Sequence, residues 1–222
     1  LVKETGWAKF DYIMNYPVEN LKEKLGIPSD KKVILYAPTF SDKLQSADDL
    51  LPVIPRIIRP NELFLLKFHE LKNERFIEQI IAETGNQIMI INSHDITPYL
   101  HVSDVMISDT SSVLYEFMAL DKPVITYKTR SRKDKGIDIT HPDELRPALD
   151  RCLKNPKEFS NLRKQHLNEV NPRLDGSIAK TIFDTLDAVV KNNELSKKKK
   201  PLNLFRKVKI LYHELFRKGY IR

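Results

Sequence analysis

Short, continuous apolar runs alternate with amphipathic stretches between residues 32 and 193 of the chain. The apolar runs are rich in Val, Ile, Leu and Phe and are not broken by a polar residue at every second position, which is typical of strands covered on both faces. The runs are residues 32–37, 62–68, 87–91, 104–108 and 123–127. Because helical patterns separate these strands, the sequence predicts an α/β fold with a doubly wound, Rossmann-like parallel sheet.

The helical patterns begin at or next to Asp, Asn, Ser or Pro residues, which commonly start helices. They cover residues 48–58, 73–83, 95–102, 111–120, 141–153, 155–167 and 175–193. The first of them is interrupted by Pro52 and Pro55. We therefore expect an N-terminal segment over residues 1–30, an α/β domain over 31–193, and a separate C-terminal region over 194–222.

Charge is distributed unevenly along the chain. From Ser196 to Arg222 there are ten Lys or Arg residues against Glu214 alone, which gives this region a charge of +9. Since the formal net charge is +7, the remaining residues carry −2. A near-neutral domain without an aromatic stacking platform argues against nucleic-acid binding.

The C-terminal region also contains an amphipathic helical pattern over residues 202–218. Its basic residues fall mostly outside the apolar face, so the pattern predicts a helix that lies on an anionic membrane surface. The alternative is that this face packs on the domain or on another subunit. The expected membrane-contacting residues are Phe205, Leu211, Tyr212, Leu215 and Phe216.

No targeting or membrane-spanning signal accompanies this pattern. No apolar run is long enough to span a bilayer, and the N-terminus lacks a basic-then-apolar secretion signal. Cys152 is the sole cysteine, and its helical context predicts a core residue. We therefore expect a cytoplasmic protein at the inner face of the cell membrane.

Because the sequence does not begin with Met, we also expect a fragment of a longer enzyme.

Candidate chemistry gathers where predicted strands end. Residues 104–108 lead into Asp109, Thr110, Ser111 and Ser112, followed by a helical pattern. The free N–H groups at a helix start and the hydroxyl groups together suit a phosphate, although a single Ser would also serve as a helix cap. In an open parallel sheet, ligands bind at the carboxyl ends of the strands. We therefore predict a phosphate site at this turn.

Two further strand ends point to the same edge of the sheet. The strand over 62–68 ends in Lys67 and is followed by His69, which can transfer a proton near neutral pH. The strand over 32–37 is followed by Thr39, Ser41 and Asp42. The sequence has no Cys/His metal-ligand spacing, dinucleotide fingerprint or P-loop, so neither a nicotinamide dehydrogenase nor a P-loop kinase is supported. We expect no metal and no cofactor.

Several of these stretches together resemble the CDP-glycerol glycerophosphotransferase family, which makes teichoic-acid-type glycerol phosphate chains in bacteria. The resemblance rests on "ILYAPTF", "LLKFHE", "DITPYLHVSDVMISDTSSVLYEF", "DKPVITY" and "DGSIAKTI". It implies the C-terminal, nucleotide-binding half of a GT-B enzyme that transfers glycerol phosphate from CDP-glycerol to a hydroxyl of a lipid-linked or polymeric acceptor. It also implies that an N-terminal GT-B domain is missing from this chain.

The resemblance assigns roles to individual residues. His69 matches the family's strand-end histidine and is expected to be catalytic. Asp109 and the hydroxyl turn (Thr110, Ser111 and Ser112) match the family's residues at the donor pyrophosphate. Lys67 and Thr39 are expected to bind the donor and its phosphates because of their position at strand ends. One departure concerns Ser41, where family members commonly carry Arg.

Two alternatives stay open. The first is another nucleotide-sugar enzyme of the GT-B type, such as a glycosyltransferase or an epimerase-like relative. The second is a non-catalytic domain that docks on membranes or a partner and retains a relic site.

Overall fold

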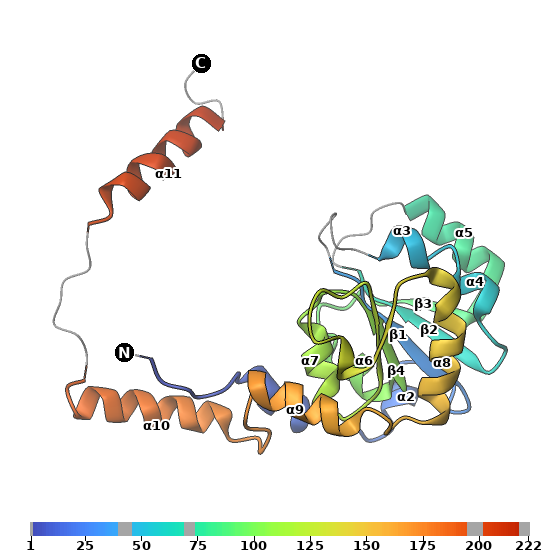
Figure 1. Ribbon diagram of the computed structural model, residues 1–222, viewed down its shortest axis with the longest axis horizontal. Coiled ribbons are helices and arrows are strands. Elements are labelled where there is room, and N and C mark those ends of the chain that lie inside the picture. The colour runs from blue at the N-terminus through green and yellow to red at the C-terminus, as the bar shows by residue number, and fades with distance from the viewer. Residues whose placement is uncertain (1, 40–45, 69–73, 195–201, 218–222) are drawn as a thin grey trace. The chain divides into compact units, whose positions relative to one another are not determined.

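The computed structural model describes residues 2–39, 46–68, 74–194 and 202–217 (Figure 1). Its contacts divide the chain into one compact unit over residues 4–183 and a second unit made of residues 1–3 and 184–222. The compact unit therefore includes residues 4–30, which the sequence pattern set apart. The boundary between the units falls inside the helix that begins at Ile178.

A parallel six-stranded sheet forms the centre of the compact unit. Its strands lie in the order β3-β2-β1-β4-β5-β6, and all neighbouring pairs are parallel. This is the order of a doubly wound, Rossmann-like sheet, as the sequence predicts. The strands are β1 Lys32–Tyr36, β2 Glu62–Leu66, β3 Ile88–Ile90, β4 Val105–Ser108, β5 Val124–Tyr127 and β6 Ile137–Ile139.

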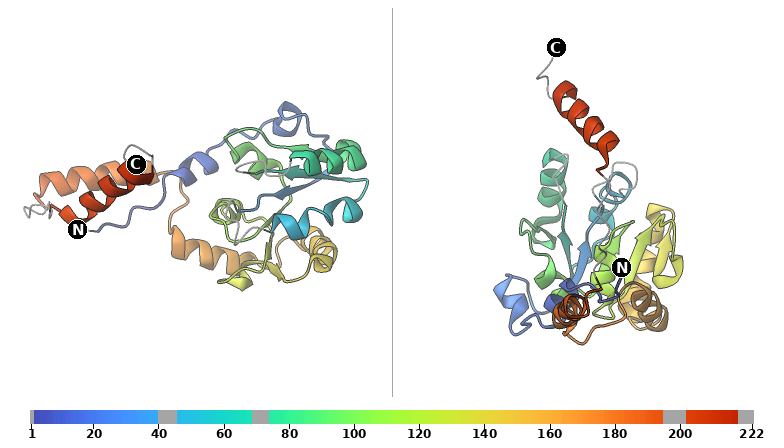
Figure 2. Two further views of the ribbon diagram at one scale, coloured as in Figure 1. Left: turned by 90° about the horizontal axis from the view of Figure 1, so that it is seen from above. Right: turned by 90° about the vertical axis from the view of Figure 1, so that its left-hand side faces the viewer.

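Helices cover both faces of the sheet, as the ribbon views show (Figures 1 and 2). On one face, the side chains of Ile34 and Tyr36 pack in a core with residues of α3, α4, α5 and α8. On the other face, Val33 and Leu35 pack with residues of α1, α2, α6 and α7. Alternate residues of β1 thus supply two cores, which explains why its sequence is apolar throughout.

The helices of the two units are α1 Lys9–Met14, α2 Leu21–Lys24, α3 Ala47–Leu50, α4 Ile54–Ile57, α5 Glu74–Thr84, α6 Thr97–Val102, α7 Val113–Met118, α8 Leu145–Lys154, α9 Ser160–Val170, α10 Ile178–Lys191 and α11 Leu204–Arg217. Short 3₁₀ turns are η1 Gly85–Gln87, η2 Lys133–Lys135 and η3 Pro142–Glu144. The predicted helix over 48–58 is divided into α3 and α4. Pro52 lies between them, and Pro55 occupies the first turn of α4, where a missing N–H costs nothing.

Hydrogen bonds tie the N-terminal segment to the last helices of the compact unit. The carboxylate of Asp11 in α1 accepts bonds from the N–H groups of Ile178 and Ala179 at 3.0 and 2.7 Å. These N–H groups have no partner within the first turn of α10, so Asp11 caps that helix. The N–H of Trp7 donates to Oδ1 of Asn171 at 2.8 Å. The segment before β1 is thereby fixed against the sheet domain.

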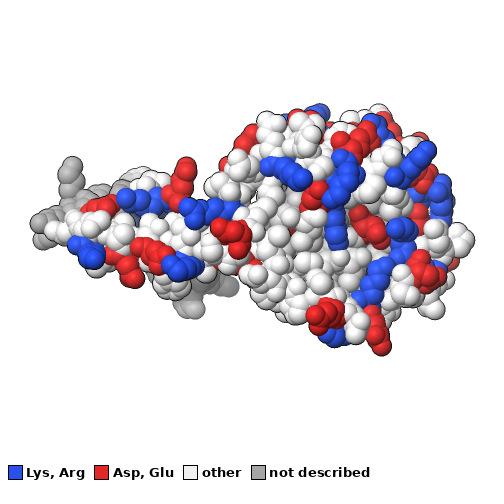
Figure 3. Space-filling model, turned by 90° about the horizontal axis from the view of Figure 1, so that it is seen from below, with Lys and Arg blue, Asp and Glu red and all other residues white. Residues whose placement is uncertain are grey.

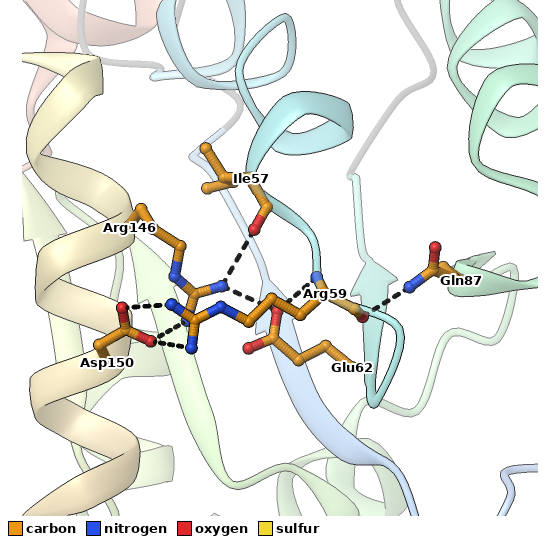
Figure 4. A network of polar contacts seen from close by, with 6 residues as sticks. All are labelled: Ile57, Arg59, Glu62, Gln87, Arg146 and Asp150. Atoms are coloured by element: carbon orange, nitrogen blue, oxygen red, sulfur yellow. Dashed lines mark hydrogen bonds and ion pairs between the residues drawn. The ribbon is translucent and has the colours of Figure 1, made fainter.

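A polar network lies at the amino end of β2 (Figure 4). Arg146 of α8 donates to Glu62 and Asp150, each at 2.8 Å, and to the carbonyl of Ile57 at 3.1 Å. Glu62 also accepts a bond from the N–H of Arg59. The Glu62 side chain is 2% exposed and the Arg146 side chain 16%, so this ion pair is shielded from water. It joins the start of β2 to α8.

Cys152 lies in the core between the sheet and α8, as its sequence context predicts. Burial raises the pKa of its thiol to about 12. Since the thiolate is the reactive form, this cysteine is chemically inert in the folded domain.

Candidate functional site

A pocket of about 300 Å³ lies at the carboxyl edge of the sheet, on the side opposite the Glu62–Arg146 pair. The loops that follow β1, β2, β3 and β4 contribute to it, together with α7 and the N-terminal segment. The pocket is lined by Trp7, Lys9, Ala37, Pro38, Lys67, Phe68, His94, Ile96, Ser111, Ser112, Val113 and Glu116. It therefore combines apolar walls with a few charged and hydroxyl groups, as small-molecule sites commonly do.

The topology explains the position of this pocket. From β1 the chain adds β2 and β3 on one side, and it then returns to place β4 on the other side of β1. The loops after β1 and β4 consequently leave in opposite directions and open a crevice between them. Ala37 and Pro38 follow β1, and Ser111 and Ser112 follow β4, so the pocket lies at this switch point.

The hydroxyl turn, Thr110 to Ser112, connects β4 to α7. The Ser111 hydroxyl accepts a long bond of 3.4 Å from the N–H of Val113, and the Ser112 side chain makes no capping bond. Ser111 and Ser112 line the pocket. Thr110 is exposed to solvent and is not among the lining residues. The Ser112 hydroxyl thus makes no capping bond, and the Ser111 hydroxyl, which accepts one long bond, keeps its own proton to donate to a ligand.

The helix after the turn is shorter than the sequence pattern predicts. Residues 111–120 were expected to be helical, but α7 covers only Val113–Met118. It ends before Asp121, whose φ of 50° is in the left-handed region. A six-residue helix carries a weaker dipole than a long one, so hydroxyl and N–H donors contribute more to an anion site here than the helix axis does.

Asp109 lies behind the turn and not in the pocket. It is fully buried, and its carboxylate accepts bonds of 2.9 Å from the N–H of Thr39, the N–H of Ser46 and the hydroxyl of Ser46. Burial raises the pKa of Asp109 above its usual value, while the bonds from Thr39 and Ser46 oppose that shift. The geometry assigns Asp109 to holding the loop after β1, and direct donor contact stays a prediction.

The other predicted donor-binding residues occupy different positions relative to the pocket. Lys67 is half-buried in the pocket lining, and its ammonium donates to the carbonyl of Phe68 at 3.3 Å. Thr39 contacts Asp109 through its N–H and is not among the lining residues. His69, Ser41 and Asp42 lie outside the described residues, so their roles stay predictions.

The lining residues that were not expected from the sequence include Trp7, Lys9, His94 and Glu116. His94 is exposed after β3, and the strand-end rule that selected Lys67 also applies to it. Glu116 is 3% exposed and belongs to the buried face of α7. Trp7 and Lys9 reach the pocket from the N-terminal segment through long-range contacts. No local sequence pattern predicts such contacts.

The predicted membrane-contacting residues lie on α11, in the second unit. Phe205, Leu211 and Tyr212 are 85%, 62% and 59% exposed. Leu215 is half-buried, and the side chain of Phe216 lies outside the described residues. Leu204 and Val208 add to the exposed apolar face at helical spacing.

Two features are absent from the residues that the structure describes. In the part of the chain that the structure covers, no group of three His, Cys, Asp or Glu side chains is placed to hold a metal ion. Within the same residues, no helix has the length and apolarity needed to cross a membrane. On the face of the compact unit in Figure 3, cationic and anionic side chains are interspersed.

Curated relatives of the chain act in teichoic acid synthesis. It is 33% identical over 140 residues to a teichoic acid glycerol-phosphate primase from Bacillus spizizenii, covering 60% of this chain and 35% of the relative. It is 30% identical over 138 residues to a teichoic acid poly(glycerol phosphate) polymerase of the same organism, covering 56% and 34%. A Staphylococcus aureus ribitol-phosphate polymerase, TarK, is 29% identical over 117 residues, covering 49% and 22%.

Solved structures with the same fold include the wall teichoic acid polymerase TagF, with a TM-score of 0.61 and 21% identity, covering 87% of this chain and 53% of TagF. Anabaena HepE in complex with UDP and glucose gives a TM-score of 0.56 at 15% identity, covering 77% and 51%. The chain thus spans about a third of the first two curated relatives and about half of these solved structures. The sequence profile of the CDP-glycerol:poly(glycerophosphate) glycerophosphotransferase family matches residues 2–187, and the chain belongs to this family.

Proposed function

We propose that this chain supplies the donor-binding half of a transferase that moves glycerol phosphate from CDP-glycerol to a hydroxyl of a teichoic-acid-type polymer. The observation that carries the proposal is the pocket at the β1–β4 switch point, where the hydroxyls of Ser111 and Ser112 and the ammonium of Lys67 line one cavity. A diphosphate needs hydrogen-bond donors and positive charge, and this lining offers both. The family membership supports the same substrate class.

The reaction requires attack by an acceptor hydroxyl oxygen on the phosphorus that carries glycerol. The bond from this phosphorus to the bridging oxygen breaks, and cytidine monophosphate leaves with the electron pair. Fixed donors such as the Ser111 and Ser112 hydroxyls are suited to stabilise the charge that develops on the phosphate oxygens. The acceptor proton needs a base, and His69 is the candidate from the sequence. The acceptor is polymeric or lipid-linked in this proposal.

Two other donors compete with CDP-glycerol. CDP-ribitol is a candidate because relatives of the chain include ribitol-phosphate polymerases. A UDP-sugar is a candidate because HepE, which shares the fold, binds UDP-glucose. Titrating the purified chain with all three nucleotides separates them, and we expect CDP-glycerol to bind most tightly. Preference for a UDP-sugar would place the chain among glycosyltransferases.

Replacing Ser111 and Ser112 together by alanine should weaken binding of CDP-glycerol. Because hydrogen bonds to charged groups contribute roughly 1–3 kcal/mol, the dissociation constant should rise about tenfold or more. Isothermal titration calorimetry on the 222-residue chain measures this. Ser29→Ala is a matched control, since Ser29 is exposed before β1 at the opposite edge of the sheet. Unchanged affinity in the double variant, with the fold intact, contradicts the phosphate site.

We also propose that α11 brings the enzyme to an anionic membrane, where lipid-linked acceptors lie. Its exposed apolar face, with Phe205, Leu211 and Tyr212, suits the acyl boundary. Its Arg206, Lys207 and Lys209 suit anionic head groups, at about 1 kcal/mol for each cation near the surface.

Liposome sedimentation tests the membrane proposal. Binding should require anionic lipid, decrease with salt, and disappear when residues 197–222 are removed. A second variant, Lys207→Gln with Lys209→Gln, keeps the apolar face and should weaken binding to anionic lipid by about 2 kcal/mol, since the other basic residues of the region remain. If the truncated chain sediments as well as the intact one, or if truncation unfolds the domain, α11 is a structural helix.

A further inference from the structure

The loop that follows β5 concentrates positive charge. Residues 128–135, the basic loop, contain five Lys or Arg residues against Asp134 alone, which gives a charge of +4. Because residues 1–195 together carry −2, the remainder of that stretch carries −6. The positive charge is therefore confined to this loop, and it favours a negatively charged partner at this place on the domain.

The basic loop lies beside the hydroxyl turn. β5 is the neighbour of β4 in the parallel sheet, with Thr126 paired to Ser108, so the segments that follow both strands leave from the same edge. The guanidinium of Arg132 donates to the hydroxyl of Tyr115 in α7 at 2.8 Å. Since Tyr115 is three residues after Ser112, the loop is attached about one helical turn from the proposed phosphate site.

A buried lysine holds the basic loop from its inner side. Lys135 is 3% exposed, and its ammonium donates to the carbonyl groups of Ser131 and Arg132 at 3.4 and 3.0 Å. In a trans peptide unit the C=O and the N–H of the next residue point in opposite directions. The N–H groups of Arg132 and Lys133 therefore point away from Lys135, toward the outer side of the loop.

Several groups on this outer side are free to bind an anion. Among the described residues, the N–H groups of Arg132 and Lys133 have no backbone partner. Arg132 has a φ of 50°, and consecutive N–H groups at such a left-handed residue form a concave anion site. Arg130 and Ser131 are exposed, and no partner for Arg130 occurs in the described part of the chain. The Lys133 side chain is 63% exposed, with its ammonium 3.7 Å from Asp138.

Ion pairs fix the loop at its start and near its end. Nζ of Lys128 lies 3.0 Å from the carboxylate of Asp49, and Nε of Arg132 lies 3.1 Å from that of Glu169. These two cations shape the loop, whereas Arg130 and Lys133 keep their charge available. A loop whose shape is set before the ligand arrives loses little conformational entropy on binding.

From this arrangement, and resting on the proposed function, we propose that residues 130–133 bind the phosphodiester chain of the polymeric acceptor. A glycerol phosphate polymer carries one negative charge in each repeat and has no aromatic part. Backbone N–H groups and exposed cations are the groups that recognise such a chain. Because the loop adjoins the hydroxyl turn, the terminal hydroxyl of the acceptor can reach the donor while its preceding phosphates contact the loop.

A nuclear magnetic resonance titration of the isotope-labelled full chain with a short glycerol phosphate oligomer tests the proposal. The backbone amide signals of Arg132 and Lys133 should shift as the oligomer is added, and the affinity should decrease as salt rises. Following these two signals separates the loop from the basic C-terminal region, which also attracts polyanions.

Arg130→Gln with Lys133→Gln removes two exposed cations and should weaken oligomer binding at the loop about tenfold. Its affinity for CDP-glycerol should equal that of the wild type, because neither residue lines the donor pocket. Lys24→Gln with Arg56→Gln is the matched control. It removes the same two charges from exposed residues that precede β1 and β2, and it should leave the titration at the loop unchanged.

Several outcomes overturn the proposal. It is wrong if the signals of Arg132 and Lys133 do not shift, or if the control variant weakens binding at the loop as much as the loop variant does. Tighter binding there of single-stranded DNA of equal charge would assign the surface to nucleic acid. Inorganic phosphate that binds there as tightly as the oligomer would assign it to the free ion.

The donor titration keeps this inference separate from the proposed function. If the wild type binds CDP-glycerol but the oligomer leaves the loop unchanged, only this inference fails. If the oligomer binds at the loop but CDP-glycerol does not bind the chain, the proposed donor is wrong, and the loop is no longer assigned to an acceptor.

Discussion

Arg146→Met is expected to lower the free energy of unfolding of the compact unit by about 3–5 kcal/mol, the range for breaking a buried ion pair by removing one partner. The cause is Glu62, which is 2% exposed and loses its guanidinium contact at 2.8 Å. One bond to Glu62, from the N–H of Arg59, would remain. Urea denaturation followed by circular dichroism measures the change.

Two controls separate burial from charge. Arg59→Met breaks the ion pair between Arg59 and Asp150, whose side chains are 53% and 39% exposed, respectively. An exposed pair contributes only about 0.2–1 kcal/mol to stability. Combining Arg146→Met with Glu62→Leu removes both buried charges and should recover much of the lost stability. A loss below about 1 kcal/mol for Arg146→Met would show that water reaches the pair.

His69→Ala is expected to reduce glycerol phosphate transfer by about 10²-fold, the effect of losing a general acid–base group. The residue follows Lys67 and Phe68, which line the pocket, although His69 itself lies outside the described residues. Transfer of radiolabelled glycerol phosphate should be measured in the complete enzyme that contains this chain. Near-normal turnover combined with a lowered melting temperature would assign His69 to stability instead.

The sheet was largely predictable from the sequence because five of its strands are continuous apolar runs. β6 was missed since it is three residues long and carries Asp138 in its middle. Asp138 belongs there for tertiary reasons: it accepts bonds from the Thr126 hydroxyl at 2.7 Å and the Thr129 N–H at 3.0 Å. A polar residue whose partners lie on the neighbouring strand and in the loop after it leaves no local pattern.

Site residues could be predicted from the sequence only where their position directly after a strand fixes their place in the fold. Ser111, Ser112 and Lys67 follow strands of a parallel sheet, and the rule that strand ends share an edge brought them together. Glu116 was not predicted because a charged residue in a short helix is usually exposed to solvent. Lys9 escaped notice because its position depends on contacts of its segment with residues more than 100 positions away.

The carboxylate of Asp109 accepts hydrogen bonds from the N–H groups of Thr39 and Ser46. Asp109 directly follows β4 and precedes the hydroxyl turn, so one buried side chain couples the chain after β1 to the chain after β4. These are the two chain segments that diverge at the switch point and open the crevice. A change at this single position would therefore loosen both walls of the pocket together.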